Sequence, residues 1–408
     1  MKAGPLAAVA GAFLALACPA VANDPFAVVV TSTTVAPYSA TYKSFPDLLH
    51  DVLNAQGGFV PFISTDFSAN VAFLGIPNAV LANSNTSGTS VQVQMPGIGF
   101  SRVFTGPNRD NVEHQIEDFF LKEGTGVVGA FLAYVAKQSA VAVTDGNPSS
   151  STALMAGNAF VTQGFTPVED LAFTAAAPTP ARGSGLAIGF NRGSFNANGM
   201  KGVFHEFELP FTVKCTDRVS LSGSIPVNML SLEGAKIYGI GLNLGLPLRL
   251  EVMDTTNPVN WRLTPLLGIS ARGSRDLAGG GVIWMTGLTN NIDFRVSPKL
   301  IVCLVDQVTI HESTTVKYSD YKFDPNINQQ MLKNGLRFAS PLSPKTTADL
   351  FVIETNYLKD AAVKNFTTFG GSLTFRLNEK RHLTLGANYD TGANYRSWSA
   401  GLSSAWRF

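Results

Sequence analysis

The carboxy-terminal half of the chain alternates between apolar residues and small or polar ones with a period of two. In residues 238–250, seven alternate positions from Tyr238 to Leu250 are apolar, and three of the six residues between them are glycine. Neighbouring side chains of a β-strand point to opposite faces, so this stretch predicts a strand with one wholly apolar face. A soluble sandwich, whose outer face meets water, has little room for such a strand, whereas a membrane-spanning barrel requires it.

The same alternation recurs from Leu186 to the last residue and indicates an antiparallel barrel of about twelve strands. Weak strand signals are easily split or merged, so we expect this number to hold to within about two. In the seventh strand, residues 300–305 are apolar on both faces, which suggests that part of the lumen is filled. The expected strands are residues 186–190, 205–213, 219–229, 238–250, 261–272, 280–288, 298–310, 332–339, 347–357, 368–377, 382–389 and 395–408.

The last expected strand, residues 395–408, ends in an aromatic residue and carries further aromatics on the same face. A lipid-facing strand of a barrel needs an apolar band flanked by aromatic rings. The stretch resembles the carboxy-terminal assembly signal of bacterial outer-membrane β-barrel proteins, although Ser404 on the apolar face departs from that pattern. The alternative is an amphipathic strand that closes a soluble sandwich. The expected assembly-signal residues are Trp398, Leu402, Trp406 and Phe408.

That resemblance implies a protein of the bacterial outer membrane, with the membrane lipid and the barrel-assembly machinery as partners. The first 22 residues agree with export, because Lys2 precedes an apolar core at residues 6–17 and residues 20–22 form a small-x-small cleavage site. We expect cleavage after Ala22. Cys18 would suit a lipoprotein, but the residues before it match the lipobox poorly.

Composition excludes two other classes of protein. Charged residues make up only 14% of the chain, and no run of eighteen uncharged apolar residues follows the first thirty positions, which argues against a helical membrane protein. Loss of the signal would remove Lys2 from the 30 basic residues and leave the remainder balanced against 29 acidic ones. We therefore expect no global field that would attract nucleic acid.

Residues 23–180 lack the barrel pattern and predict a small α+β domain. We expect a first helix at residues 44–56 and strands within residues 59–104. A second helix should begin at a cap near Asn108 or Asp110 and run to Gly124. This domain could be periplasmic, a plug or displayed at the cell surface.

The end of this region is more apolar. Residues 127–143 are too short and too interrupted to be a confident membrane span, so they predict a buried helix or, alternatively, a helix inside the barrel. Residues 146–151 form a turn that should cap another helix towards Phe160. Residues 175–180 resemble a linker, and we place the barrel at residues 183–408.

Connection lengths predict which rim of the barrel faces the periplasm, because outer-membrane barrels have short periplasmic turns and longer outer loops. If the last strand ends in the periplasm, the tight turns 215–217 and 378–380 lie inside and the long polar loop 312–330 lies outside. Two connections are exceptions, since 251–259 is long for an inner turn and 231–234 is short for an outer one.

The same topology separates the two cysteines of the mature chain. Cys215 ends the second strand and Cys303 lies in the seventh, about halfway round the sheet. Cα atoms more than about 7 Å apart cannot be joined by a disulfide. We predict two free thiols.

His311 and Ser313 are the strongest catalytic candidates. Their His-x-Ser spacing on a strand is similar to that of outer-membrane phospholipases, but Thr314 and Thr315 replace the Asn and Gly that continue that motif. No third group is evident, and a strand-end histidine beside a polar loop is the simpler interpretation. Metal-ligand spacings, nucleophile elbows and phosphate-binding loops do not occur in the sequence. We expect no enzyme activity, no metal and no cofactor.

Charged residues on the polar face of the strands are expected to line the lumen. Basic rings can bias a pore towards anions. Alternatively, these residues pair with nearby acids or with groups on an inserted segment. Glycines and serines on the same face leave room for water or for a protein plug. The expected pore-lining residues are Arg249, Arg262, Arg272, Arg376, Arg407, Glu206, Glu208 and Lys214.

Three functions follow from this organisation. The first is a passive pore for small solutes, with residues 23–180 as a plug or periplasmic domain. The second is surface display or adhesion, because a carboxy-terminal barrel of this strand number resembles an autotransporter translocator, although the preceding region lacks the repeats of a β-solenoid. The third is a lipid hydrolase that depends on His311 and Ser313. The oligomeric state stays open.

Overall fold

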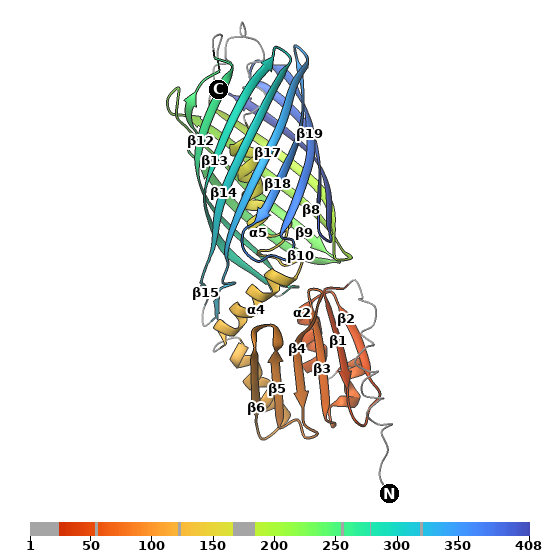
Figure 1. Cartoon of the computed structure of the whole chain (residues 1–408). Helices are drawn as coiled ribbons and strands as arrows, with labels where there is room; N and C mark the ends of the chain where they lie inside the picture. Colours follow the sequence, from red (N-terminus) through yellow and green to blue (C-terminus); the bar gives the residue numbers. More distant parts are fainter. Residues whose placement is uncertain are drawn as a thin grey trace.

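The structure is a computed structural model that describes residues 24–53, 56–120, 124–165, 184–253, 257–277, 279–318 and 321–408. It consists of a tall β-barrel and a small α+β region that lies against one rim of it (Figure 1). The carboxy terminus lies at the opposite rim. The proposed signal peptide and the linker at residues 175–180 lie outside the described residues.

Twelve strands close the barrel, as the alternation predicted. Each strand pairs with the next in antiparallel register, and β21 closes the ring on β7 from Tyr395 opposite Ala197 to Arg407 opposite Gly185. The strands are β7 (Gly185–Ala197), β8 (Met200–Lys214), β9 (Ser220–Leu232), β10 (Ala235–Gly245), β12 (Val259–Ser274), β13 (Gly279–Ser297), β14 (Leu300–Thr314), β17 (Asn328–Ser343), β18 (Thr346–Tyr357), β19 (Asn365–Asn378), β20 (Arg381–Gly392) and β21 (Tyr395–Arg407).

The alternation at residues 238–250 covers two strands instead of one. Strand β10 ends at Gly245, and a short strand, β11 (Leu248–Glu251), follows and pairs with the start of β12. Pro247 lies between them. Because proline has no backbone N–H to give to a ladder, the strand breaks there even though the apolar pattern continues.

The amino-terminal region contains one antiparallel sheet with helices packed on it. The order of its strands is β2-β1-β3-β4-β5-β6, and β1 and β2 precede the part in which the sequence indicated strands. Its elements are β1 (Phe26–Thr31), β2 (Tyr38–Tyr42), α2 (Phe45–Leu53), a 3-10 helix (Gly57–Phe62), β3 (Phe67–Phe73), β4 (Ile76–Ser84), β5 (Ser90–Met95), a second 3-10 helix (Pro96–Ile98), β6 (Phe100–Thr105) and α3 (Arg109–Asp118).

Both helices expected in this region form. Helix α2 occupies the expected first site, and α3 begins after the predicted cap, where the side chain of Asn108 accepts a hydrogen bond of 2.9 Å from the backbone N–H of Asn111. Such a cap satisfies one of the N–H groups that a helix start leaves unpaired.

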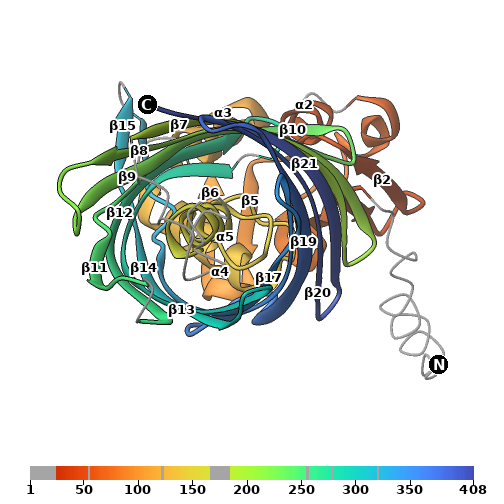
Figure 2. The same cartoon turned by 90° about the horizontal axis from the view of Figure 1, so that it is seen from above.

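Two further helices connect this region to the barrel. Helix α4 (Thr125–Gln138) leads to the mouth of the barrel, and α5 (Ser151–Ala159) with its following π-helical turn (Phe160–Gly164) lies in the lumen (Figure 2). The helix inside the barrel is thus the one that follows the turn at 146–151, not the more apolar stretch 127–143. Among the described residues, no helix combines the length and hydrophobicity needed to cross a bilayer.

One apolar core joins the amino-terminal sheet to the mouth of the barrel. Phe73 of β3 and Phe131 of α4 meet edge to face with ring centroids 5.2 Å apart. Met200 and Leu232, at the ends of two barrel strands, are buried in the same cluster. The backbone N–H of Phe45 also donates to the carbonyl of Asp276 in a barrel turn at 2.7 Å. The region is therefore docked on the rim by packing as well as by hydrogen bonds.

Candidate functional site

The polypeptide inside the lumen forms the candidate site. The chain enters the barrel at the rim that holds the amino-terminal region, and α5 continues along the lumen (Figures 1 and 2). The first barrel strand then starts at the opposite rim, where Gly185 pairs with Arg407. Residues 24–138 and the start of the barrel wall therefore lie at opposite rims, with α5 inside the lumen.

The turn before α5 is fixed at the mouth by side chains of the barrel wall. Tyr357 donates its hydroxyl hydrogen to the carbonyl oxygen of Asn147 at 2.7 Å, and Gln329 Nε2 donates to Asp145 Oδ2 at 3.2 Å. The backbone N–H of Val363 donates to the carbonyl of Gly146 at 3.0 Å. These groups are buried, so each hydrogen bond replaces contacts with water that the turn has lost.

Gly146 is required by the shape of this turn. Its φ of +85° lies in the left-handed region that other residues rarely adopt. A Cβ atom there would also collide with the carbonyl oxygen of Ala136 in α4. The glycine therefore lets the chain reverse tightly between α4 and α5.

The first turn of α5 is capped from its own sequence and held by β12. Ser150 accepts a hydrogen bond from the backbone N–H of Ala153, which makes it the cap that the sequence predicted. Ser151 and Ser270 of β12 share a hydrogen bond of 3.1 Å. Arg272, which is buried, donates from Nη1 to the carbonyl of Ser149.

A second arginine of β12 binds the far end of the luminal segment. Arg262 Nη2 donates to the carbonyl oxygens of Gln163 at 3.2 Å and Gly164 at 2.8 Å. A helix leaves its last carbonyls unpaired and carries partial negative charge there, so a guanidinium is a favourable partner. The hydroxyl of Ser222 in β9 donates a further hydrogen bond to this end of the segment, to the side-chain oxygen of Gln163.

Apolar contacts fill the rest of the lumen around the segment. Phe160 is fully buried and packs with Phe165, Val305 and Ile353 in one cluster. Cys303 and Val305, which face inwards in the stretch 300–305, therefore meet a filled lumen, as the pattern of that stretch suggested. A second cluster, formed by Met155 and Ala159 with Leu266, Ile283, Met285 and Ile327, covers another side of α5.

The expected pore-lining residues fall into two groups. Arg262, Arg272 and Glu206 contact the luminal segment, since Asn158 Nδ2 of α5 donates to Glu206 Oε2 at 3.3 Å. Glu208 follows on the same face of β8, and Arg249, Arg376, Arg407 and Lys214 lie near the rim that carries the carboxy terminus. The basic residues thus form no single ring.

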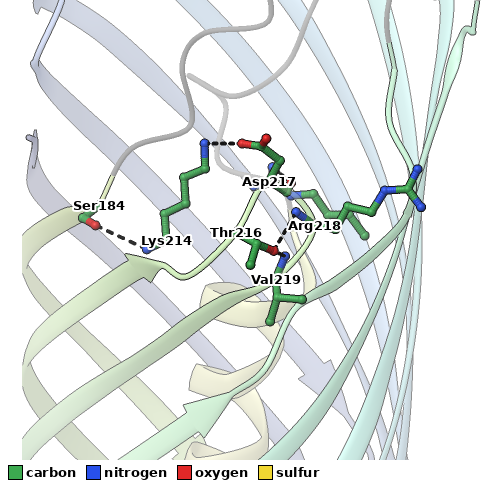
Figure 3. Close-up of polar contacts among 7 residues, drawn as sticks. Ser184, Lys214, Thr216, Asp217, Arg218 and Val219 are labelled. Atoms are coloured by element: carbon green, nitrogen blue, oxygen red, sulfur yellow. Dashed lines mark hydrogen bonds and ion pairs between the residues drawn. The ribbon is translucent and has the colours of Figure 1, made fainter.

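The turn after β8 shows the polar character of that rim. Lys214 Nζ lies 2.6 Å from Asp217 Oδ1, and Thr216 Oγ1 accepts backbone hydrogen bonds from Arg218 and Val219 at 3.2 and 3.0 Å (Figure 3). Arg249 Nη1 donates to the carbonyl of Asp217 at 3.3 Å.

His311 and Ser313 have separate partners. His311 is buried towards the lumen, where Nε2 lies 3.0 Å from Thr309 Oγ1. Ser313 Oγ donates to Asp324 Oδ1 at 2.7 Å and accepts from the backbone N–H of Ile327 at 2.8 Å. Ser313 therefore stabilises a loop. The described ranges contain no cluster of three His, Cys, Asp or Glu side chains that could hold a metal.

The cysteines lie in contrasting places. Cys215 is exposed in the turn shown in Figure 3, whereas Cys303 is buried towards the lumen. Both thiols are free in the described part of the chain.

Several residues of the site were not identified from the sequence. Tyr357, Gln329, Ser222 and Ser270 each bind the luminal segment. Tyr357, Ser222 and Ser270 lie in predicted strands, a position that many residues share, whereas Gln329 falls in the expected loop 312–330 and belongs to β17 in the structure.

The outer wall of the barrel is apolar, with aromatic side chains near both rims. Tyr238 and Trp398 are 59% and 57% exposed near the rim that holds the amino-terminal region, and Trp261 and Phe408 are exposed near the other. Between them the large exposed side chains are mainly Leu, Ile, Val and Phe. An apolar band between two aromatic girdles is the surface that lipid requires. The protein is a membrane-spanning β-barrel of the outer-membrane type.

The expected assembly-signal residues are all on β21 or directly after it. Trp398, Leu402 and Phe408 are exposed on the lipid side, and Trp406 is half-buried. Their role in assembly stays a prediction.

Comparisons with known proteins bear on the fold of this outer-membrane barrel. No protein-family model matches the sequence, and no curated protein matches it. Among solved structures, the translocator domain of the autotransporter NalP from Neisseria meningitidis has a TM-score of 0.44 and 11% identity, covering 55% of this chain and 89% of that domain. An outer membrane channel from Pseudomonas putida F1 has a TM-score of 0.42 and 16% identity, covering 55% and 96%. The likeness concerns the fold alone.

Proposed function

We propose that the barrel displays residues 24–138 at the cell surface, with the following segment crossing the lumen. The observation that supports this is the path of the chain. The amino-terminal region and the first residue of β7 lie at opposite rims, and α5 lies in the lumen between them. A periplasmic domain attached to the same barrel would be expected at the rim where β7 starts.

The orientation rests on the connections at the two rims. Two-residue turns occur at both rims, at 198–199, 233–234 and 393–394 beside the amino-terminal region and at 298–299, 344–345 and 379–380 beside the carboxy terminus. The connection between β14 and β17, which is the long polar one, lies at the other rim beside α4. The seven-residue connection 358–364 lies at the same rim, whereas the carboxy-terminal rim has one long connection, between β10 and β12. Long loops are typical of the outer side. The amino-terminal region is therefore assigned to the outer side.

A freely open pore is less compatible with the same contacts. The mouth at the proposed outer side is covered by an apolar core, and the lumen contains α5 with its hydrogen bonds and two apolar clusters. Solute passage would require withdrawal of this segment. The proposed display role needs no catalytic group.

Two matched protease sites test the orientation. A short recognition sequence is inserted into the exposed β4–β5 turn at Asn85–Gly88, and the same sequence is inserted between Pro344 and Lys345 in the β17–β18 turn. We expect protease added to intact cells to cut the first site and to spare the second until the outer membrane is permeabilised. The reverse pattern would place the amino-terminal region in the periplasm and overturn the proposal.

Cys215 provides a check without insertions, because it is exposed while Cys303 is buried. A membrane-impermeant maleimide should label the mature protein only after permeabilisation. Labelling at Cys215 on intact cells would contradict the assigned orientation.

A further inference from the structure

Three basic side chains line a hollow on the outside of the barrel, next to the amino-terminal region. The hollow has a volume of about 640 Å³, and Lys43, Lys201 and Arg396 contribute to its lining together with Trp398 and Tyr389. Lys43 belongs to the amino-terminal region, and the other four residues belong to strands of the barrel wall.

Strand register places two of these cations side by side on the lipid face. Arg396 of β21 is opposite Asn196 of β7, which is opposite Lys201 of β8. Their neighbours Tyr395 and Met200 are buried, so the alternation directs Arg396 and Lys201 outwards. The three residues form a row across adjacent strands.

The aromatic residues lie one step further from the rim. Trp398 is two residues beyond Arg396 on the same face of β21, and it is paired with Tyr389 of β20. Tyr and Trp concentrate where lipid tails meet headgroups. Cations placed one row closer to the rim therefore lie at the level of the headgroups.

Two acids lie nearby, and one of them, Glu233, also lines the hollow, so the lining carries three positive charges and one negative charge. Glu233 Oε1 accepts from the N–H of Lys201 at 2.6 Å, and Asp276 Oδ2 accepts from the N–H of Lys236 at 2.8 Å. Within the described ranges, Lys43, Lys201 and Arg396 form no ion pair. Their charge is available to a ligand.

Arg192 extends the basic row into the lipid-facing wall. It is exposed on β7 between Ala400 of β21 and His205 of β8, one step deeper than Trp398. An arginine facing lipid costs about 2–4 kcal/mol at the bilayer midplane and about 0–1 near the interface. Long basic side chains reduce this cost by extending to the headgroups, where a phosphate can pair with them.

Docking of the amino-terminal region completes the hollow. The backbone hydrogen bond from Phe45 to Asp276 fixes the chain two residues after Lys43. A Cβ added to Gly234 in the β9–β10 turn would lie 3.4 Å from Lys43 Cδ, so the lysine stem packs against that turn. Elements β2 and α2 extend beyond the outline of the barrel, above where the membrane surface would lie (Figure 2).

We propose that this hollow binds the phosphate group of a membrane lipid, with Arg396, Lys201 and Lys43 as its cationic ligands and Trp398 and Tyr389 against the upper part of the lipid. Guanidinium and ammonium groups form short, charge-assisted hydrogen bonds with phosphate oxygens. The apolar wall below the cations favours a phosphate that is attached to acyl chains. A bound lipid would bridge the barrel and the displayed region.

The proposed site requires only that the barrel lies in a membrane. The leaflet from which the lipid comes depends on the proposed orientation of the barrel. Under that orientation the lipid is a phosphorylated glycolipid of the outer leaflet. If the rim were periplasmic, an inner-leaflet phospholipid would occupy the hollow.

The test uses the full mature protein in detergent and native mass spectrometry. The probes are diphosphoryl lipid A, its fully dephosphorylated form, phosphatidylglycerol and inorganic pyrophosphate. The test variant is Lys43→Gln/Lys201→Gln/Arg396→Gln. The control variant is Lys299→Gln/Lys345→Gln/Lys380→Gln, which removes the same charge from exposed turns at the other rim. Resistance of the barrel to unfolding in cold detergent verifies that each variant is folded.

We expect diphosphoryl lipid A to bind the native protein and the control variant equally, and the test variant about tenfold more weakly or worse. The dephosphorylated form should bind weakly to all three. Equal binding of both forms, or an unchanged test variant, would overturn the site. Displacement of the lipid by pyrophosphate at equal concentration would overturn the assignment to a lipid. Binding of phosphatidylglycerol alone would support the phosphate site while contradicting the orientation.

Discussion

The two rims of the barrel are closed in different ways. At the rim beside the amino-terminal region, a buried apolar core and buried hydrogen bonds join the barrel to 115 residues of a separate fold and to the turn before α5. At the other rim, the turn between β8 and β9 meets water through exposed contacts such as Lys214 with Asp217. Breaking a buried contact costs more free energy than breaking an exposed ion pair. The first rim should therefore contribute most of the stability of the closed barrel.

The largest effect is expected from removing the luminal segment itself. Deletion of residues 24–165 should convert a barrel without steady current into one with a steady single-channel conductance in planar bilayers. Deletion of residues 24–118 alone should leave α5 in place through its own contacts with β12 and β13 and keep the current low. Equal conductance of the two deletions would show that the amino-terminal sheet, and not α5, closes the lumen.

Phe160→Ala should cause the next largest effect. The side chain is fully buried in the lumen, and such a truncation typically destabilises a protein by about 3–5 kcal/mol because it leaves a cavity. The free energy of unfolding in detergent, measured with guanidinium, tests this value. Phe369→Ala serves as the control, because that ring is half exposed on the lipid face and leaves the lumen unchanged. Similar losses in both variants would contradict a filled lumen.

Tyr357→Phe should have a moderate effect at the outer mouth. It removes the hydroxyl that donates to the carbonyl of Asn147, an oxygen that still accepts from the backbone N–H and the hydroxyl of Ser150. The expected cost is therefore that of one hydrogen bond, about 0.5–1.5 kcal/mol. The loss of unfolding free energy is measured with guanidinium in detergent, as for Phe160→Ala. In bilayer recordings, brief openings should become more frequent. An unchanged stability would mean that water replaces the hydroxyl at no cost.

Asp217→Asn should have the smallest effect. The hydrogen bond from Lys214 and its positive charge lower the pKa of this exposed carboxyl. A lowered pKa stabilises the fold above the ordinary carboxyl pKa, and that contribution is lost as the pH falls through the lowered value. The unfolding temperature of the variant should therefore match that of the native protein at acidic pH and differ only slightly at neutral pH. A large loss at neutral pH would show that this rim also carries stability.

Local patterns predicted the barrel well, because the alternation of apolar residues is imposed directly by a wall with lipid outside. The same pattern concealed the break at Pro247, where backbone chemistry and not side-chain polarity decides the strand end. The cap at Ser150 was also predictable, since it depends on a few adjacent residues.

The contacts of the lumen could not be predicted in the same way. Arg262 binds two backbone carbonyls, and a carbonyl carries no sequence signal. The sequence favoured residues 127–143 over α5 as a helix inside the barrel, because that stretch is the more apolar of the two. The structure holds α5 in the lumen partly through polar side chains of the wall, which hydrophobicity does not indicate. The sequence could not indicate the basic hollow beside Trp398. Lys43 and Arg396 lie near opposite ends of the chain, and they line one hollow only when the amino-terminal region packs on the barrel.

The lumen has room for α5 and its neighbours, whereas the amino-terminal region contains a sheet of six strands. Under the proposed orientation, that sheet cannot have crossed the barrel as a folded body. The polypeptide must have passed as an extended or helical thread, and β1 to β6 acquired their register only on the far side. Phe73 and Phe131 then pack on one another beside the mouth, and the chain could slide back only after this contact broke. Folding would thus act as the ratchet that prevents the exported chain from sliding back.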